Sequence, residues 1–95
     1  MNKVFLFVEI DVKPNQVEVF LQELYKQAGI IRAEVGCESI EIFKNDAHDN
    51  KIHVWEIWSD KAAWDRHMKN DSSKAWQIAA SELVTGEKIT VLRKP

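Results

Sequence analysis

The chain has 95 residues, 45% of them hydrophobic and 29% charged, which is typical of a globular protein and excludes a disordered or low-complexity chain. This length supports one hydrophobic core, so we expect a single domain over residues 1–95. The 13 basic and 15 acidic residues are interspersed and give a formal net charge of -2, which excludes the basic surface that nucleic-acid binding requires.

Residues Val4 to Val12 alternate along the chain in the way that predicts a β-strand. One face carries aliphatic side chains: Val4, Leu6, Val8, Ile10 and Val12. The other face carries Phe5, Phe7, Glu9 and Asp11. Because acidic residues follow the apolar run directly, we interpret the segment as a strand and not as a signal peptide. No apolar run reaches the ~20 residues that cross a bilayer, so we expect a soluble protein without a membrane partner. A single cysteine is typical of a reducing compartment, so we expect a cytoplasmic location.

A helix is predicted next. Pro14 ends the strand, and Asn15 with Glu18 is typical of a helix cap and its reciprocal partner. Apolar residues then recur at spacings of three and four, which predicts an amphipathic helix up to about residue 34. These residues are Val17, Phe20, Leu21, Leu24, Ala28 and Ile31. Gly29 weakens this helix locally, and Gly36 is expected to end it.

The following residues predict a β-hairpin. Its strands are expected from Glu38 to Lys44 and from Ile52 to Trp58, with Asn45 to Lys51 as a polar loop between them. In the returning strand, one face carries Val54, Glu56 and Trp58, and the other carries His53, Trp55 and Ile57. Both faces of this strand therefore carry a tryptophan.

Two short helices and a last strand complete the chain. Ser59 and Asp60 can cap a first helix, and the segment from Asp71 to Ser73 can cap a second. The first helix carries Ala63, Trp64, His67 and Met68, and the second carries Ala75, Trp76, Ala79, Ala80 and Leu83. Gly86 is expected to stop the second helix, and the final strand is expected from Lys88 to about Arg93.

This order of elements predicts an α+β fold of the ferredoxin-like βαββαβ type, with the helices on one face of a four-stranded antiparallel sheet. The other face of that sheet also carries large apolar side chains, such as Phe5, Phe7 and Trp55. An exposed sheet face of this kind is usually covered. We therefore expect a homodimer whose two sheets stack at a distance of ~10 Å.

The stretch from Glu56 to His67 reads Glu-Ile-Trp-Ser-Asp-Lys-Ala-Ala-Trp-Asp-Arg-His. Its Glu-x-Trp, acidic residue, Ala and His resemble the signature of the antibiotic biosynthesis monooxygenase family. Three other segments lie at suitable distances: Val8-Glu9-Ile10 before Lys13-Pro14, then Arg32 to Cys37, and finally Leu83 to Gly86. The resemblance covers nearly the whole chain, but it specifies the scaffold better than the reaction.

The resemblance implies a dimeric α/β barrel and oxidation of a small quinol or polyphenolic compound by O2, with no metal or flavin cofactor. Heme-degrading relatives use an Asn in the first strand, and that position falls at Phe7, which disfavours heme cleavage. Many relatives also carry Thr-Pro-His shortly after the signature His. This chain has Asp71-Ser72-Ser73 there, so a second histidine is missing.

The implied reaction needs a base and a dry aromatic pocket. His67 is the expected catalytic base, because the ordinary pKa of histidine lies nearest neutrality. The expected substrate-binding surface consists of Trp58, Phe7, Trp64 and Met68. Glu56 is also expected to be catalytic. It shares a strand face with Trp58 and could orient His67 or accept a substrate hydrogen bond. Glu9 shares a face with Phe7 and could contribute similarly.

Each candidate also has a structural interpretation. His67 could be a packed helix histidine, and Glu56 could form an ion pair with Arg66 or Lys61. Trp58, Trp64 and Trp76 could fill the core, and Trp55 is expected in the dimer interface. His48 is expected in solvent, and His53 could pair with Glu41. Cys37 is the single cysteine, which excludes an internal disulfide, and we interpret it as a small buried hydrophobe.

The sequence is compatible with three functions. The first is a monooxygenase that needs no cofactor. The second is an isomerase or lyase of a small phosphorylated carbonyl compound, which would need a basic phosphate-binding group such as Lys69, Lys74 or Arg32. The third is a dimeric ligand-binding or stress-response module without turnover. A cavity shared by Glu56 and His67 would favour the first two over the third.

Overall fold

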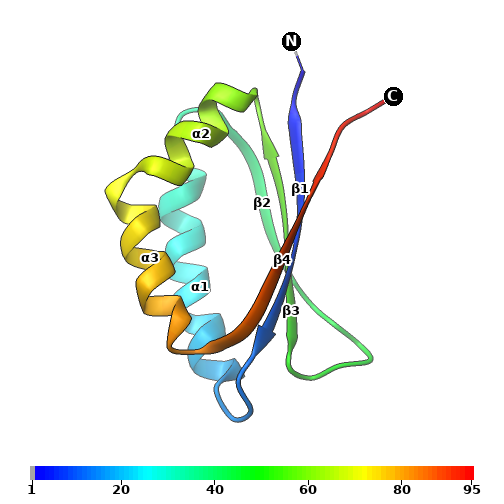
Figure 1. Cartoon of the computed structure of the whole chain (residues 1–95), viewed down its shortest axis with the longest axis vertical. Coiled ribbons are helices and arrows are strands. Elements are labelled where there is room, and N and C mark those ends of the chain that lie inside the picture. Colours follow the sequence, from blue (N-terminus) through cyan, green and yellow to red (C-terminus); the bar gives the residue numbers. More distant parts are fainter. Residues whose placement is uncertain (1) are drawn as a thin grey trace.

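The computed structural model describes residues 2–95, which form one four-stranded antiparallel sheet with three helices on one of its faces (Figure 1). The elements are β1 (Val4–Val12), α1 (Val17–Arg32), β2 (Cys37–Lys44), β3 (Lys51–Trp58), α2 (Lys61–Lys69), α3 (Asp71–Ser81) and β4 (Val84–Leu92). The strands lie in the order β2-β3-β1-β4. This confirms the predicted α+β, ferredoxin-like arrangement. No helix in the described part of the chain is both long and apolar enough to span a bilayer.

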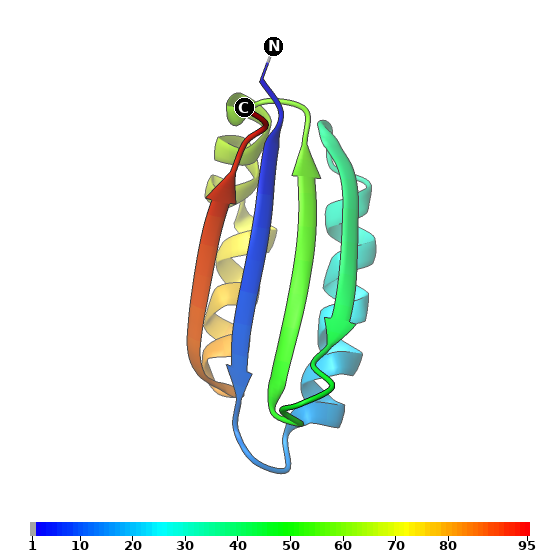
Figure 2. The same ribbon diagram turned by 90° about the vertical axis from the view of Figure 1, so that its right-hand side faces the viewer.

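The core lies between the aliphatic face of β1 and the apolar stripe of α1. Leu6, Val8, Ile10 and Val12 are buried, as alternation along the strand predicts. Phe20 and Leu24 are the buried side chains of α1 nearest its start, and the same stripe continues along the helix. The helices therefore cover the aliphatic face of the sheet and leave the other face open, and Figure 2 looks onto that open face.

The chain enters α1 by a turn and not by the predicted cap. The backbone N–H of Gln16 donates to the carbonyl of Lys13 at 3.1 Å, with Pro14 and Asn15 between them. Asn15 has φ 66, a left-handed conformation that Asn tolerates better than most residues. The prediction that Asn15 caps the helix was therefore wrong. Gln16 occupies the cap position, and its side chain forms no capping hydrogen bond.

The caps of α2 and α3 lie at polar side chains directly before each helix. The Asp60 carboxylate accepts a hydrogen bond from the backbone N–H of Ala63 at 2.8 Å, which confirms the predicted cap. The Asn70 side chain accepts one from the backbone N–H of Ser73 at 2.7 Å. The second cap is thus Asn70 and not the segment from Asp71 to Ser73. Asn70 was missed because three further capping residue types follow it.

The last strand begins earlier than predicted. Helix α3 ends at Ser81, and β4 already starts at Val84, so Gly86 lies inside the strand. Gly86 pairs with Asp11 beside the register shift between Asp11 and Val12. A glycine inside a strand commonly marks such an irregularity. Gly86 therefore does not end the helix.

Gly36 makes the turn between α1 and β2, at φ 90. A Cβ atom at this position would clash with the Cβ atom of Ala63 and lie 3.0 Å from Ser59 Oγ. The carbonyl of Gly36 accepts a hydrogen bond from the backbone N–H of Ser59 at 2.8 Å. The end of α1 is thereby held against the start of α2, and this brings residue Glu34 close to α2.

Candidate functional site

His67 and Glu34 form the polar centre of the helix side of the sheet. His67 lies in α2 and is buried, and its Nδ1 atom is 2.9 Å from Glu34 Oε2 and 3.1 Å from Glu34 Oε1. The Asn70 side chain donates a further hydrogen bond to Glu34 Oε1 at 3.0 Å, and Ser73 Oγ lies 3.2 Å from His67 Nδ1. A carboxylate at Nδ1 holds the proton on that nitrogen. Nε2 is then the ring nitrogen that is free to accept a proton.

Trp58 and Glu56 form the wall behind the imidazole. The ring centroids of Trp58 and His67 are 4.8 Å apart, and the planes are tilted by 31°. Trp58 Nε1 donates a hydrogen bond to Glu56 Oε1 at 2.9 Å, and both side chains are buried. Lys61 pairs with Asp65 instead, at 3.1 Å. The alternative in which Glu56 forms an ion pair with Arg66 or Lys61 was therefore wrong.

Burial dominates the electrostatics of Glu56. Desolvation raises the pKa of its carboxyl group, while the hydrogen bond from Trp58 and the proximity of His67 lower it in part. The charges of Glu87 and Glu34 raise the pKa further. Partial burial also raises the pKa of Glu87. The helix side of the sheet therefore holds carboxyl groups whose neutral forms are favoured relative to carboxyl groups in water.

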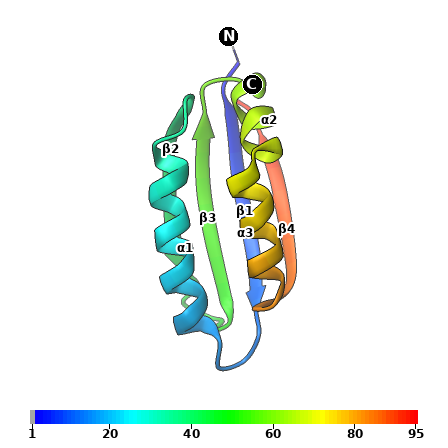
Figure 3. The same cartoon turned by 90° about the vertical axis from the view of Figure 1, so that its left-hand side faces the viewer.

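A cavity of about 100 Å³ lies between the sheet and the helices that Figure 3 shows in front of it. Its polar lining includes His67, Glu56 and Glu87, and its aromatic lining consists of Trp64 and Trp76. Aliphatic side chains of β1, β3 and α1 provide much of the remaining wall. The lining that residues 2–95 provide contains no Lys or Arg. It therefore offers a base, carboxyl groups and aromatic surface, but no cation to bind a phosphate.

The predicted pocket residues divide into three groups. Trp64 and Met68 line the cavity together with His67 and Glu56, as expected. Trp58 is 0% exposed and does not belong to the lining, so it packs behind His67 instead of offering a surface to a ligand. This corrects its predicted place in the pocket.

Phe7 and Glu9 lie on the other side of the sheet. In the β1 and β3 register, Phe7 pairs with Trp55 and Glu9 pairs with His53. The rings of Phe7 and His53 are stacked at a centroid distance of 5.3 Å. Residues that pair across neighbouring strands share a face, so Phe7 and Glu9 face away from the helices. The prediction that they share a pocket with Trp58 was therefore wrong.

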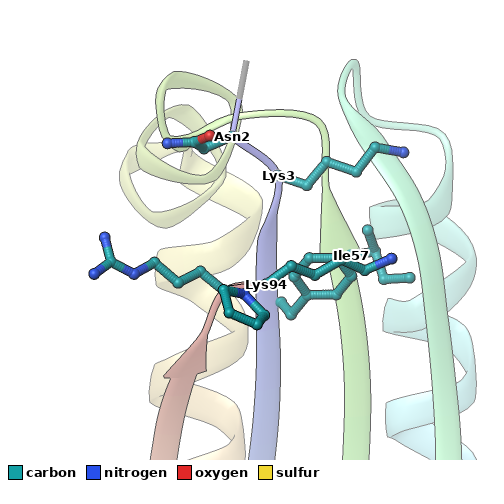
Figure 4. Close-up of a pocket in the computed structure, with 7 residues that line it drawn as sticks. Asn2, Lys3, Ile57 and Lys94 are labelled. Atoms are coloured by element: carbon teal, nitrogen blue, oxygen red, sulfur yellow. The ribbon is translucent and has the colours of Figure 1, made fainter.

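A larger hollow of about 720 Å³ lies on the open face, next to the two ends of the chain (Figure 4). Its apolar lining consists of Phe5, Ile57 and Pro95, and its basic residues are Lys3, Arg93 and Lys94. Lys94 Nζ lies 5.8 Å from the centre of the Phe5 ring. This hollow contains no base or acid suited to proton transfer near neutral pH. It is a feature of the open face and not the candidate active site.

The remaining candidates lie away from the cavity. His53 does not pair with Glu41, because Glu41 is opposite Trp55 and the His53 Nε2 atom is 3.0 Å from Asn45 Nδ2. His48 is exposed, as predicted. Burial raises the pKa of Cys37, which disfavours its reactive thiolate form and agrees with the interpretation as a small hydrophobe.

No cluster of three or more His, Cys, Asp or Glu side chains among residues 2–95 is arranged to hold a metal ion. Glu34, Asn70 and Ser73 were missed as parts of the site. The sequence signal for Glu34 is weak, because it follows the periodic part of α1 and belongs to no apolar pattern. The capping pattern before α3 could have indicated that Asn70 and Ser73 lie near His67.

Comparison with known proteins gives a family and a fold. Residues 4–79 match the model of a family described as antibiotic biosynthesis monooxygenase. The uncharacterized protein sll1783 from Synechocystis sp. is 32% identical over 60 residues, which are 63% of this chain and 41% of that protein. The match therefore spans less than half of that relative.

Similar solved structures come from several organisms. PA3566 from Pseudomonas aeruginosa is 23% identical with a TM-score of 0.91, over 100% of this chain and 96% of that chain. A conserved protein from Methanosarcina mazei Go1 is 22% identical with a TM-score of 0.93, and the match covers 100% of this chain and 95% of that chain. A candidate antibiotic biosynthesis monooxygenase from Nitrosomonas europaea is 13% identical with a TM-score of 0.91, and the match covers 97% of this chain and 89% of that chain. At these identities the likeness establishes the fold.

Proposed function

This chain belongs to the antibiotic biosynthesis monooxygenase family, and from this premise we propose that it oxidises a small quinol or polyphenolic compound with O2, without a metal or flavin. The observation that carries the proposal is the position of His67. The imidazole lines an aromatic cavity, and the Glu34 carboxylate at Nδ1 leaves Nε2 free to act as a base.

The proposed reaction begins with transfer of a hydroxyl proton from the quinol to His67 Nε2. The anion that forms has an electron-rich ring carbon, which donates electrons to O2 and forms a carbon–oxygen bond, and the peroxide anion takes the proton back from the His67 imidazolium. The resulting hydroperoxide loses water to give the hydroxyquinone, so one oxygen atom enters the product and the other leaves as water. Glu34 stabilises the imidazolium while it carries the proton, because their charges are opposite. Apolar walls favour spread of the negative charge over the ring.

Two observations weigh against the other functions. The cavity has no Lys or Arg in its lining and carries Glu56 and Glu87, which disfavours a phosphorylated substrate. Glu56 and His67 line one cavity, which favours turnover over a module that merely binds a ligand. An electron-rich phenol that O2 can oxidise is the substrate class that fits a base, carboxyl groups and aromatic walls.

We further propose that two copies pair through their open faces. Phe5 and Trp55 contact one another there at a centroid distance of 6.0 Å, and Phe43 is 48% exposed. A second sheet would cover these aromatic side chains.

Oxygen uptake tests the proposed activity. Purified protein is mixed with a panel of hydroquinones, catechols and simple phenols in an oxygen electrode, and uptake above the uncatalysed rate is measured. The proposal predicts uptake with at least one dihydroxy compound and formation of a product that contains one oxygen atom from 18O2. Absence of uptake across the panel contradicts it. Turnover of a carbonyl compound under nitrogen would instead support the isomerase or lyase.

A further inference from the structure

Glu87 lies at the mouth of the same cavity and has no role in the reaction described above. In β4 it pairs with Ile10, whose side chain is buried on the helix side, so Glu87 also faces the helices. Glu87 and the exposed Met68 both belong to the cavity lining. The cavity therefore opens to solvent on the side lined by Glu87 and Met68.

Glu87 and Glu56 lie at different places along the cavity. Glu56 pairs with Leu6 of β1, whereas Glu87 pairs with Ile10, four residues further along the same strand. Four residues correspond to about 13 Å along a strand, and β3 and β4, which flank β1, are separated by about 10 Å across the sheet. Even so, the Glu87 charge contributes to the raised pKa of Glu56. A ligand in the cavity therefore meets a carboxyl group near His67 and a second one at the mouth.

Among residues 2–95, no side chain forms a hydrogen bond or ion pair with the Glu87 carboxyl group. Its pKa is raised by burial alone, without a hydrogen bond or an opposite charge as a further cause. Asp11, in the neighbouring strand, pairs instead with Lys51 at 2.9 Å. The Glu87 side chain is exposed to solvent at the edge of the cavity, so its carboxyl group is available to a ligand.

The cavity volume limits the ligand to one ring. The volume is about 100 Å³, and an apolar cavity of about 150 Å³ in another protein binds benzene. A six-membered ring that is partly inserted therefore fills the space, and its far substituent remains near the mouth. Fused rings would require the helices to move.

We propose that Glu87 forms a hydrogen bond with the hydroxyl group remote from the reacting end, so that the cavity selects a single-ring compound with hydroxyl groups at opposite ends, such as 1,4-dihydroxybenzene. This rests on the proposed function and adds the substrate class and a specificity-determining residue. His67 takes the proton from the inner hydroxyl, and Glu87 binds the outer one. A ring with a methyl group at the outer position fits the same space but leaves Glu87 unpaired.

Calorimetric titration under nitrogen tests this selection without turnover. The ligands are 1,4-dihydroxybenzene and 4-methylphenol, which have similar shapes and differ in the outer hydroxyl. The wild-type protein is compared with Glu87→Leu and Glu87→Gln, and Glu82→Leu is the matched control, because Glu82 is exposed and does not line the cavity. Circular dichroism verifies that each variant is folded.

The wild type and Glu82→Leu are expected to bind the dihydroxy compound about tenfold more tightly than 4-methylphenol, the usual effect of a hydrogen bond to a charged group. In Glu87→Leu the ratio of the two dissociation constants falls to about one, and 4-methylphenol still binds. In Glu87→Gln the ratio is intermediate. An unchanged ratio in Glu87→Leu, or no binding of either ligand by the wild type, overturns the inference. Selective binding without oxygen uptake contradicts the proposed oxidation and leaves the role of Glu87 standing.

Discussion

His67 Nδ1 lies 2.9 Å from Glu34 Oε2, so a histidine in α2 is oriented by a carboxylate 33 residues earlier, just past the end of α1. The side chains of His67 and Glu34 are 10% and 20% exposed, which limits competition from water for this contact. The arrangement joins a base to the group that fixes its proton and stabilises its charged form.

Replacement of Glu34 by glutamine is expected to lower turnover. The amide oxygen can still accept the Nδ1 proton, but it has no charge with which to stabilise the imidazolium. We expect kcat to fall by less than in a variant that lacks the imidazole, because the base itself remains. Steady-state oxygen uptake measures the effect. Glu38→Gln is the control, because Glu38 is partly exposed and pairs with Lys3; equal losses in both variants would contradict a specific role for Glu34.

The Glu56→Gln substitution is expected to make the stability of the folded protein less dependent on pH. Burial raises the pKa of Glu56 above the ordinary value of 4.5, so the folded state binds more protons than the unfolded state between these two values. The stability that Glu56 contributes is thus present below 4.5 and is lost as the pH rises through the folded pKa. The amide keeps an acceptor for Trp58 Nε1 and carries no charge.

Urea unfolding at a series of pH values and one protein concentration measures this difference. The free energy of unfolding of Glu56→Gln relative to the wild type should increase with pH and then become constant above the folded pKa. A relative stability that decreases as the pH rises would contradict the proposed cause.

Substitution of Gly36 and of Gly29 by alanine is expected to change the stability in opposite directions. Gly36→Ala places a side chain against Ala63 at a positive φ, and we expect a loss of stability on the order of 2 kcal/mol or more. Gly29→Ala meets nothing within 4 Å and removes a flexible residue from α1, so a gain of about 0.5–1 kcal/mol is expected. Thermal or urea unfolding of both variants tests the pair. A neutral Gly36→Ala would show that the turn does not need glycine.

The exposed aromatic side chains of the open face predict that two copies of the chain form a dimer. Trp55→Glu introduces a charge among the aromatic side chains of that face, where burial in an interface would be costly. We expect the wild type to sediment with twice the mass of one chain and the variant to sediment with the mass of one chain. Tyr25→Glu is the control, because Tyr25 is 61% exposed on α1, away from the open face. A wild type that remains monomeric at high concentration would contradict the pairing.

Much of the fold could be predicted from periodicity. The alternation in β1 indicated which of its side chains are buried, and the stripe of α1 indicated which residues pack on them, since both patterns follow directly from backbone geometry. The boundaries were less predictable, because Gly86 and Asn15 each fit two local roles. Glycine follows helices and also marks irregular strands, so only the pairing with Asp11 decides which role Gly86 has.

The candidate site was predicted in part. His67, Glu56, Trp64 and Met68 were expected together, because one strand end and the following helix carry them all. The position of Phe7 depends on strand register, which places it opposite Trp55, and alternation within one strand does not give that register. Glu34 was missed because its contact with His67 spans 33 residues and depends on the turn at Gly36.

The most direct test of the account compares His67→Ala with His48→Ala in oxygen uptake. His67 lines the cavity, whereas His48 is exposed in the β2–β3 loop. With a dihydroxy substrate, His67→Ala is expected to lower kcat by about 10²–10⁴-fold, the usual contribution of a general base, and His48→Ala should match the wild type. A folded His67→Ala variant that consumes oxygen at the wild-type rate would contradict the central claim that this imidazole is the base.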